Sequence, residues 1–255
     1  MKLEGFSPPF TDIAPYYDRI MSFVNYPSWI SYIERILQVN GIKEEKLLDL
    51  ACGTGTCLEL WYKKGYKVIG LDNSNQMLEV CRSKFPREAM ENGCVQLIQG
   101  DFRNFSLNDS VPIITCLYDS LNYLLTKDDL LSCFRSVYRN LCIKGIFIFD
   151  MNTIHALRDE WGNQIFERND GPIHSIWANT FDPVTNISSL RLTINVRENE
   201  RTLTFREFHQ ERAYSLEDIR YIAALAGFQI FLYRHLTFNP ASERDIRIMG
   251  VARKL

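Results

Sequence analysis

Residues 47–56 read Leu-Leu-Asp-Leu-Ala-Cys-Gly-Thr-Gly-Thr, and this segment decides the fold. It joins a short apolar run, typical of a buried strand, directly to a Gly-x-Gly turn and then to a helical stretch. Such a turn lets the backbone approach a ligand closely and directs free N–H groups at it. The same turn can also be a tight connection that binds nothing, so the segments that follow must distinguish the two interpretations.

An aspartate stands where a nucleoside site needs one. The next apolar run, residues 68–71, ends at Asp72, about 20 positions beyond the glycine turn. At the tip of the second strand, this carboxylate is placed to accept hydrogen bonds from two ribose hydroxyls. The alternative is that Asp72 belongs to the N-cap region of the helix after it. Dinucleotide enzymes carry a third glycine where this chain has Leu58, so the pattern favours S-adenosylmethionine over NAD.

Strand-like runs alternate with helical stretches up to Asp150, which implies a parallel sheet. After Asp150 strands follow one another directly, before a helix that opens at Ser215 and ends at Gly227. We therefore predict an α/β fold, a Rossmann-like, mostly parallel seven-stranded sheet with an inserted antiparallel β lobe and an N-terminal helical lid. The predicted sheet strands are 46–50, 67–71, 95–99, 111–117, 146–150, 229–233 and 246–252, and those of the lobe are 173–177, 188–196 and 203–213.

The domain organisation follows from this change of pattern. Between Asp12 and Leu37, apolar residues at helical spacing predict two helices that are broken at Pro27. The helix over 127–141 shows the clearest apolar stripe. We expect an N-terminal helical lid over 1–45, an S-adenosylmethionine-binding domain over 46–151 and 213–255, and an inserted lobe over 152–212 that supplies the acceptor pocket.

The composition narrows the partners. Lys+Arg 29 against Asp+Glu 31 gives a net charge of -2 without a basic run, so we expect no nucleic-acid partner. No apolar stretch approaches the roughly 18 residues that cross a bilayer, so we expect no membrane partner. The 7 cysteines lack C-x-x-C spacing and indicate free thiols in the cytoplasm, with no metal site. The oligomeric state is not specified, and a homodimer stays open.

The motifs together resemble those of class I, Rossmann-like S-adenosylmethionine-dependent methyltransferases. The likeness includes 49–56, 70–78 and Gln99-Gly-Asp101-Phe102. Residues 116–124 are similar to a bacterial small-molecule subgroup related to sugar-amine N-methyltransferases and glycine N-methyltransferase. The chain departs from the first motif at Ala51, where the family has glycine. The resemblance implies S-adenosylmethionine as cofactor and a small-molecule methyl acceptor, with transfer to nitrogen or oxygen.

The resemblance also implies which residues contact the cofactor. Ala51, Cys52, Gly53 and Gly55 would form the turn beside the methionine portion, with Asp49 orienting the turn and Asp72 holding the ribose. Asp101 would accept from the adenine amino group and the Phe102 N–H would meet the ring. Asn73 and Met77 would border the adenosine, and Leu117 would lie beneath the sulfonium. Tyr17 and Tyr26 are carried over as lid residues, with an aromatic core stripe as the alternative.

Candidate catalytic residues follow the fourth strand. Asp119 and Tyr123 lie at the carboxyl edge of the predicted sheet, where one of them could receive a proton from an ammonium acceptor. A turn cap and a core residue are the alternatives. His209, on a lobe strand, is a third candidate, although a lone histidine on a strand is more often structural or solvated. Two other functions stay open, a noncatalytic S-adenosylmethionine-binding module and an NAD-linked oxidoreductase.

Overall fold

The central element is a sheet of seven strands, in a computed structural model that describes residues 4–255. Residues 1–3, the first of the predicted lid range, lie outside the described part. All neighbouring strands are parallel except β11, which is antiparallel to both of its neighbours, so the predicted fold class is confirmed. The strand order is β10 (Phe228–Arg234), β11 (Arg247–Lys254), β5 (Leu141–Asn152), β4 (Val111–Cys116), β1 (Lys46–Leu50), β2 (Lys67–Asp72) and β3 (Val95–Gln99).

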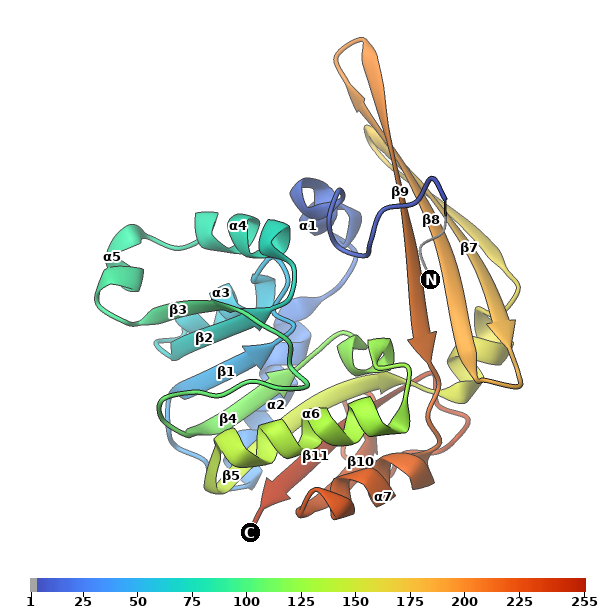
Figure 1. The fold of residues 1–255 in the computed structure, drawn as a ribbon. Helices are drawn as coiled ribbons and strands as arrows, with labels where there is room; N and C mark the ends of the chain where they lie inside the picture. Colours follow the sequence, from blue (N-terminus) through green and yellow to red (C-terminus); the bar gives the residue numbers. More distant parts are fainter. Residues whose placement is uncertain (1–3) are drawn as a thin grey trace.

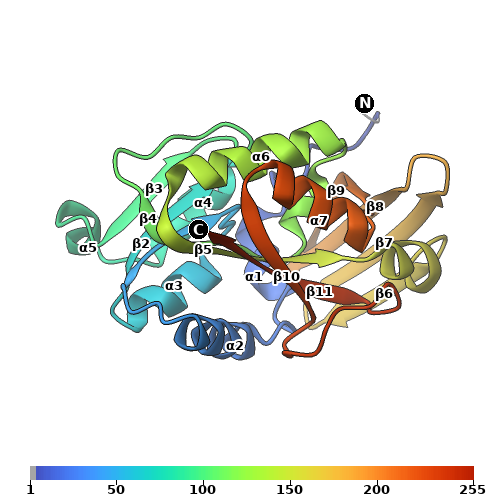
Figure 2. The same ribbon diagram turned by 90° about the horizontal axis from the view of Figure 1, so that it is seen from below.

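Helices cover both faces of this sheet (Figure 2). On one face lie α2 (Tyr26–Val39), α3 (Thr56–Lys63) and α4 (Asn75–Ser83), with α5 (Arg87–Glu91) at its edge. On the other face lie α6 (Lys127–Asn140) and α7 (Leu216–Leu225). The ends of α7 are those that the sequence predicts, because the Ser215 side chain accepts from the Asp218 N–H and Gly227 follows at φ +96°.

Four antiparallel strands, inserted between β5 and α7, form a second sheet (Figure 1). Sequence periodicity predicts three of them and misses β6, whose side chains are almost all exposed and show no alternation. A short helical turn, Ala156–Glu160, precedes them. The strands are β6 (Ile165–Asp170), β7 (Ile173–Asp182), β8 (Ile187–Glu198) and β9 (Arg201–Arg212), which together we call the lobe.

The N-terminal region differs from the prediction. Only the short turns η1 (Ala14–Tyr16) and α1 (Tyr17–Ile20) precede α2, and the break falls at 21–25 instead of Pro27. Pro27 lies in the first turn of α2, where its missing N–H costs nothing. Helix α2 packs in the core of the main sheet, so the expectation of a lid over all of 1–45 is wrong for this helix. Residues 4–25, which we call the lid segment, pass between α4 and the lobe (Figure 1).

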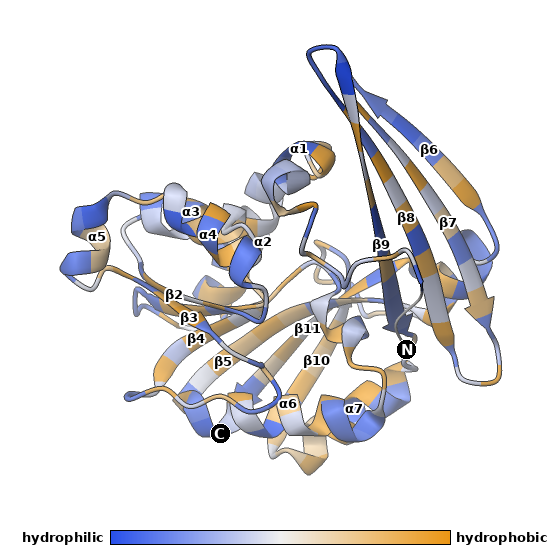
Figure 3. Cartoon of the chain, turned by 45° about the horizontal axis from the view of Figure 1, so that its top comes forward, coloured by the Kyte–Doolittle hydropathy of each residue, from blue (hydrophilic) through white to orange (hydrophobic). Residues whose placement is uncertain are grey.

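Hydropathy follows this layering. Apolar residues line the central strands and the inward sides of the helices, while the outward sides are polar (Figure 3). No helix within residues 4–255 is both long enough and apolar enough to cross a membrane. All seven cysteines are unbridged.

Candidate functional site

Three residues of the glycine turn have left-handed backbone: Ala51 (φ 52°), Gly53 (φ 55°) and Gly55 (φ 79°). A Cβ on Gly53 would have no atom within 4 Å, because this glycine faces an open cavity. A Cβ on Gly55 would lie 2.3 Å from the Cys81 Sγ of α4, so this glycine serves packing. Gly55 does not line the cavity, so its contact with the cofactor stays a prediction. Ala51 adopts the turn despite its side chain, at a cost of about 1–2 kcal/mol.

Asp72 ties the turn to the start of α4. Its Oδ2 accepts from the Gly53 N–H and its Oδ1 from the Ser74 N–H, both at 2.8 Å. The N-cap role that was the alternative for Asp72 belongs to Ser74, whose Oγ accepts from the Met77 N–H at 3.2 Å. Burial raises the pKa of Asp72. A carboxylate has about four acceptor positions, so two remain for ligand hydroxyls.

Asp49 supports the strands beneath the turn. It is buried, and its Oδ1 accepts from the Thr115 hydroxyl of β4 at 2.6 Å. The resemblance implied that Asp49 orients the turn, but its hydrogen bond joins β1 to β4. Burial raises the pKa of its carboxyl to about 7. Asp49 still lines the cavity.

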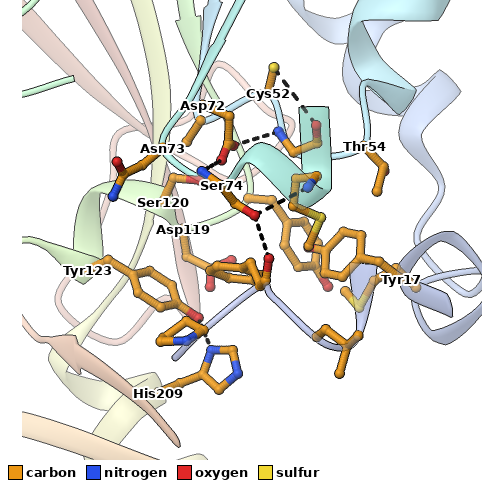
Figure 4. Close-up of a pocket in the computed structure, with 18 of the residues that line it drawn as sticks. Tyr17, Cys52, Thr54, Asp72, Asn73, Ser74, Asp119, Ser120, Tyr123 and His209 are labelled. Atoms are coloured by element: carbon orange, nitrogen blue, oxygen red, sulfur yellow. Dashed lines mark hydrogen bonds between the residues drawn. The ribbon is translucent and has the colours of Figure 1, made fainter. Parts of the chain in front are cut away.

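One cavity of about 700 Å³ extends from the glycine turn to the lobe (Figure 4). This volume lies within the range of about 300–1,000 Å³ of small-molecule sites. Of the sixteen residues proposed from the sequence, all but Gly55 and Asp101 line it. Sequence reasoning missed other lining residues, among them Phe10, Ser74, Gln99, Tyr118, Ser120 and Glu211.

Asp101 does not face the cavity. Its carboxylate forms an ion pair with Arg103 at 2.5 Å, and the Arg103 N–H donates to Oδ1 at 2.8 Å. The Arg103 guanidinium lowers the pKa of this carboxyl. Asp101 pairs with Arg103 and does not line the cavity, so its adenine contact stays a prediction. Gln99 and Phe102, on either side of it, do line the cavity.

The tip of β4 is strained and rigidly held. Tyr118 (φ 62°) and Asp119 (φ 53°) are consecutive left-handed residues, each costing about 1–3 kcal/mol. Both of their N–H groups donate to the Asp150 carboxylate, at 2.5 and 3.0 Å. Arg247 pairs with Asp150 and, at 2.7 Å, with Asp119 Oδ1, and its guanidinium lies over the Tyr118 ring. The Asp119 side chain makes no capping hydrogen bond, so its alternative role as a cap is not seen.

A buried polar chain joins this region to the lobe. The Tyr123 hydroxyl lies 2.9 Å from His209 Nδ1 (Figure 4). On the other side of the ring, His209 Nε2 lies 3.2 Å from Glu207 Oε2. Glu207 is fully buried and accepts from the N–H groups of Phe10 and Thr11, at 2.8 and 3.0 Å. These contacts fasten the lid segment to β9. His209 and Tyr123 both line the cavity, so Tyr123 is more than a core residue, whereas the buried hydrogen bond of His209 also fits its structural alternative.

Glu211 is a further carboxyl in the cavity. Asn152 Nδ2 donates to its Oε2 at 3.0 Å, and within residues 4–255 no hydrogen bond to Oε1 is present. Burial, with the nearby charge of Asp119, raises the pKa of Glu211 to about 8. The sequence offered one signal for it. Glu207, His209 and Glu211 alternate along β9 and share one face with the buried side of β8, where polar residues are unusual.

The arrangement fits S-adenosylmethionine. Open space at Gly53 admits a ligand against the backbone, and the free positions on the Asp72 carboxylate suit ribose hydroxyls. The rings of Tyr17, Tyr26 and Tyr118 line the cavity and favour a sulfonium cation. Asp49, Asp72, Asp119 and Glu211 add carboxyl groups.

Comparison with known proteins agrees with this geometry. The family described as "Methyltransferase domain" matches residues 47–145. "Putative methyltransferase YqeM" of Bacillus subtilis (strain 168) is 31% identical over 87% of this chain and 87% of its own. A solved S-adenosylmethionine-dependent methyltransferase from Clostridium acetobutylicum ATCC 824 is 30% identical, covers 94% of this chain and 97% of its own, and has a TM-score of 0.84.

A relative with a named substrate matches part of the chain. The dTDP-4-amino-2,3,4,6-tetradeoxy-D-glucose N,N-dimethyltransferase of Saccharopolyspora spinosa is 32% identical over 57% of this chain and 55% of its own. The long matches to the Bacillus and Clostridium proteins carry the assignment, since each spans more than four-fifths of both chains. With the cofactor end of the cavity, they show that the chain belongs to the S-adenosylmethionine-dependent methyltransferases.

Proposed function

We propose that this enzyme transfers the methyl group to the nitrogen of a small-molecule amine, bound between the lid segment, the tip of β4 and the lobe. The observation that carries the proposal is Glu211, a carboxyl in the same cavity as the glycine turn whose Oε1 is left without a hydrogen bond in the described residues. A nitrogen acceptor must lose a proton, and Glu211 can receive one. The amino-sugar substrate named for the Saccharopolyspora relative supports nitrogen as well.

The chain's own residues would bind and orient the reactants. S-adenosylmethionine, when bound, supplies an electrophilic methyl group on a sulfonium. The backbone at Gly53 would meet its methionine portion and Asp72 its ribose, with Leu117 beneath the reacting centre. The lid segment, held by Glu207, would exclude water from above.

Asp119 and Glu211 would have different roles at the acceptor nitrogen. Arg247 lies 2.7 Å from Asp119, so we assign Asp119 to holding the ammonium and Glu211 to taking its proton at Oε1. The freed nitrogen lone pair then forms the N–C bond, while the electrons of the broken S–C bond leave with sulfur. A carboxyl whose pKa is about 8 is matched to an amine near neutral pH. We assign Tyr123 and His209 to positioning, because each is already bonded within the polar chain.

The domain ranges and the compartment predicted from the sequence are also part of this proposal. We propose that 46–151 with 213–255 binds the cofactor, and that 152–212 supplies the acceptor pocket. Support comes from the lining residues, since Trp177, Leu190 and Leu192 come from the lobe. The free cysteines support a reducing compartment such as the cytoplasm.

An isotope experiment tests the reacting atom. The protein is incubated with trideuteromethyl S-adenosylmethionine and a bacterial small-molecule extract, one half of which is first treated with N-hydroxysuccinimide acetate to acylate amines. We expect labelled products in the untreated half and their loss in the acylated half. Labelled products that survive acylation would contradict nitrogen. If calorimetry shows cofactor binding and neither half gives a product, a noncatalytic binding module is supported instead.

A further inference from the structure

Two apolar walls bound the end of the cavity that lies away from the glycine turn. The lid segment contributes Ile13, Ile20 and Met21, and the lobe contributes Leu190 and Leu192. These residues belong to one hydrophobic cluster, so the lid segment and the lobe pack against each other around the cavity. Burying an apolar ligand here is favourable at about 25 cal/mol per Å².

Trp177 adds an aromatic surface to the lobe wall. Its indole Nε1 donates to Ser175 Oγ of the same strand at 2.9 Å. The polar group of the side chain is therefore satisfied within the protein, and the ring is left to contact a ligand. Trp177 pairs with Leu192 across β7 and β8, which places both on one face of the lobe.

The charged groups at this end have one sign. Among the described residues, the cavity lining includes no lysine or arginine, whereas Asp119 and Glu211 both line it. The Arg247 guanidinium is buried behind the tip of β4, paired with Asp119 and Asp150. Proteins bind phosphates with arginine, lysine or helix N-termini, and carboxylates repel them.

The helix N-termini at the cavity do not supply a phosphate-binding site for the acceptor either. Helices α3 and α4 begin at the glycine turn and at Ser74, which is the cofactor end. The Ser74 Oγ already accepts from the Met77 N–H of α4, and Asp72 lies beside both starts with its negative charge. A diphosphate on the acceptor would therefore meet carboxylates and apolar side chains.

We infer that the methyl acceptor is a small amine whose body is apolar and carries no phosphate. Its amino group would lie at Asp119 and Glu211 and its body between the lid segment and Trp177. The assignment of the amino group rests on the proposed function, whereas the apolar, phosphate-free body rests on the cavity walls alone. The acceptor thus differs in class from the dTDP-linked sugar named for the Saccharopolyspora relative.

Calorimetry on the full chain, saturated with S-adenosylhomocysteine, tests this inference with three probes. Phenethylamine has the amine and an aromatic body, 2-phenylethanol has the body alone, and thymidine diphosphate has the phosphates. We expect phenethylamine to bind at least about tenfold more tightly than either of the others. Thymidine diphosphate binding as tightly as phenethylamine would overturn the inference, and so would phenethylamine failing to bind. Equal binding of phenethylamine and 2-phenylethanol would contradict the amine, and with it the proposed function, but not the apolar body.

A charge placed in the lobe wall gives a second test. Leu190→Lys puts an ammonium where the apolar body should lie, at a partly exposed position that tolerates a long polar side chain. We expect it to weaken phenethylamine binding about tenfold or more by like-charge repulsion, with S-adenosylhomocysteine affinity unchanged. Leu203→Lys, on the same lobe but outside the cavity, is the matched control. Equal phenethylamine affinity in the two variants would show that this wall of the lobe does not contact the acceptor.

Discussion

Glu211 is a residue whose surroundings change its acid–base chemistry. Burial raises its pKa, and the charge of Asp119 raises it further. Asn152, by its hydrogen bond, and the Arg247 charge act in the opposite direction. The charged and titratable groups around it come from the β4 tip and following turn, β5, β9 and β11, namely Tyr118, Asp119, Tyr123, Asp150, His209 and Arg247.

Glu211→Gln should separate proton transfer from binding. The amide can still accept from Asn152, so the fold and the acceptor KM should change little, while kcat should fall roughly 10²–10⁴-fold. In the natural protein kcat should rise with pH until about 8 and then level off, since Glu211 must be ionised to accept a proton. The variant should lack this rise. A variant with natural kcat and the same pH profile would show that Glu211 takes no proton.

The same substitution should change stability in a pH-dependent way. The raised pKa of Glu211 means that the folded protein keeps a proton that the unfolded chain loses above its ordinary value of 4.5. Ionisation thus destabilises the fold increasingly from about pH 4.5 to 8. Glu211→Gln removes this cost, so its Tm should exceed that of the natural protein at pH 8.5 and equal it near pH 4. The reverse order in scanning calorimetry would contradict the raised pKa.

Asp72 and Asp101 form a matched pair for the cofactor site. Asp72→Ala should weaken S-adenosylhomocysteine binding by about 1.5–3 kcal/mol, or about one to two decades, because a charge-assisted hydrogen bond is lost. It should also lower Tm, since the Gly53 and Ser74 N–H groups lose their acceptor. Asp101→Ala should leave the affinity unchanged, because Arg103 holds that carboxylate outside the cavity. Calorimetry in which Asp101→Ala has the larger effect would restore the contact implied by the sequence motif.

Among the elements, the lid segment is held on its lobe side by a buried side chain of β9, Glu207. Glu207→Gln keeps the shape of this side chain but removes the charge and one of its two acceptor oxygens. Because Phe10 donates to one oxygen and Thr11 and Ile13 to the other, the amide NH2 would face at least one of these N–H groups, which would lose its acceptor. We expect the lid segment to open more often, and stopped-flow measurements should show about tenfold faster release of S-adenosylhomocysteine. Glu200→Gln, exposed in the turn of the same lobe, is the control and should release it at the natural rate.

The elements also show what the sequence could and could not specify. Strands β1 and β3 have the predicted bounds, because each is a short β-type run between turn residues; β1 is almost fully buried, whereas β3 is a partly exposed edge strand. β6 has no buried face, so it left no pattern. At the site, the glycine turn and Asp72 follow from local spacing. The alternation of polar residues along β9 is the one signal for Glu211, but it does not place this side chain in a cavity shared with the β4 tip. Likewise, nothing in the motif indicates that Arg103, two residues further along, pairs with Asp101.

At the scale of the whole molecule, the lid segment bridges the two sheets. On the cofactor side, Asp18 accepts from the Thr54 and Thr56 hydroxyls and pairs with Lys84 at 2.6 Å. On the lobe side, Glu207 accepts from the backbone of the segment. Both ends of one short segment are thus fixed to different sheets. Ligand binding at the cofactor end can therefore affect the lobe through these contacts of the lid segment.

This bridge leads to a prediction about communication between the two ends of the cavity. S-adenosylhomocysteine should reduce the motion of the lid segment, and β9 should become less mobile as well because Glu207 connects the two. Hydrogen exchange should therefore slow at residues 7–21 and at 205–211 together when the ligand binds. In Glu207→Gln, protection should still increase in the lid segment but no longer in β9, which separates coupling from binding. Unchanged exchange of β9 in the natural protein on saturation with the ligand would show that the lobe moves independently. Cofactor occupancy would then have no means of setting the shape of the acceptor wall.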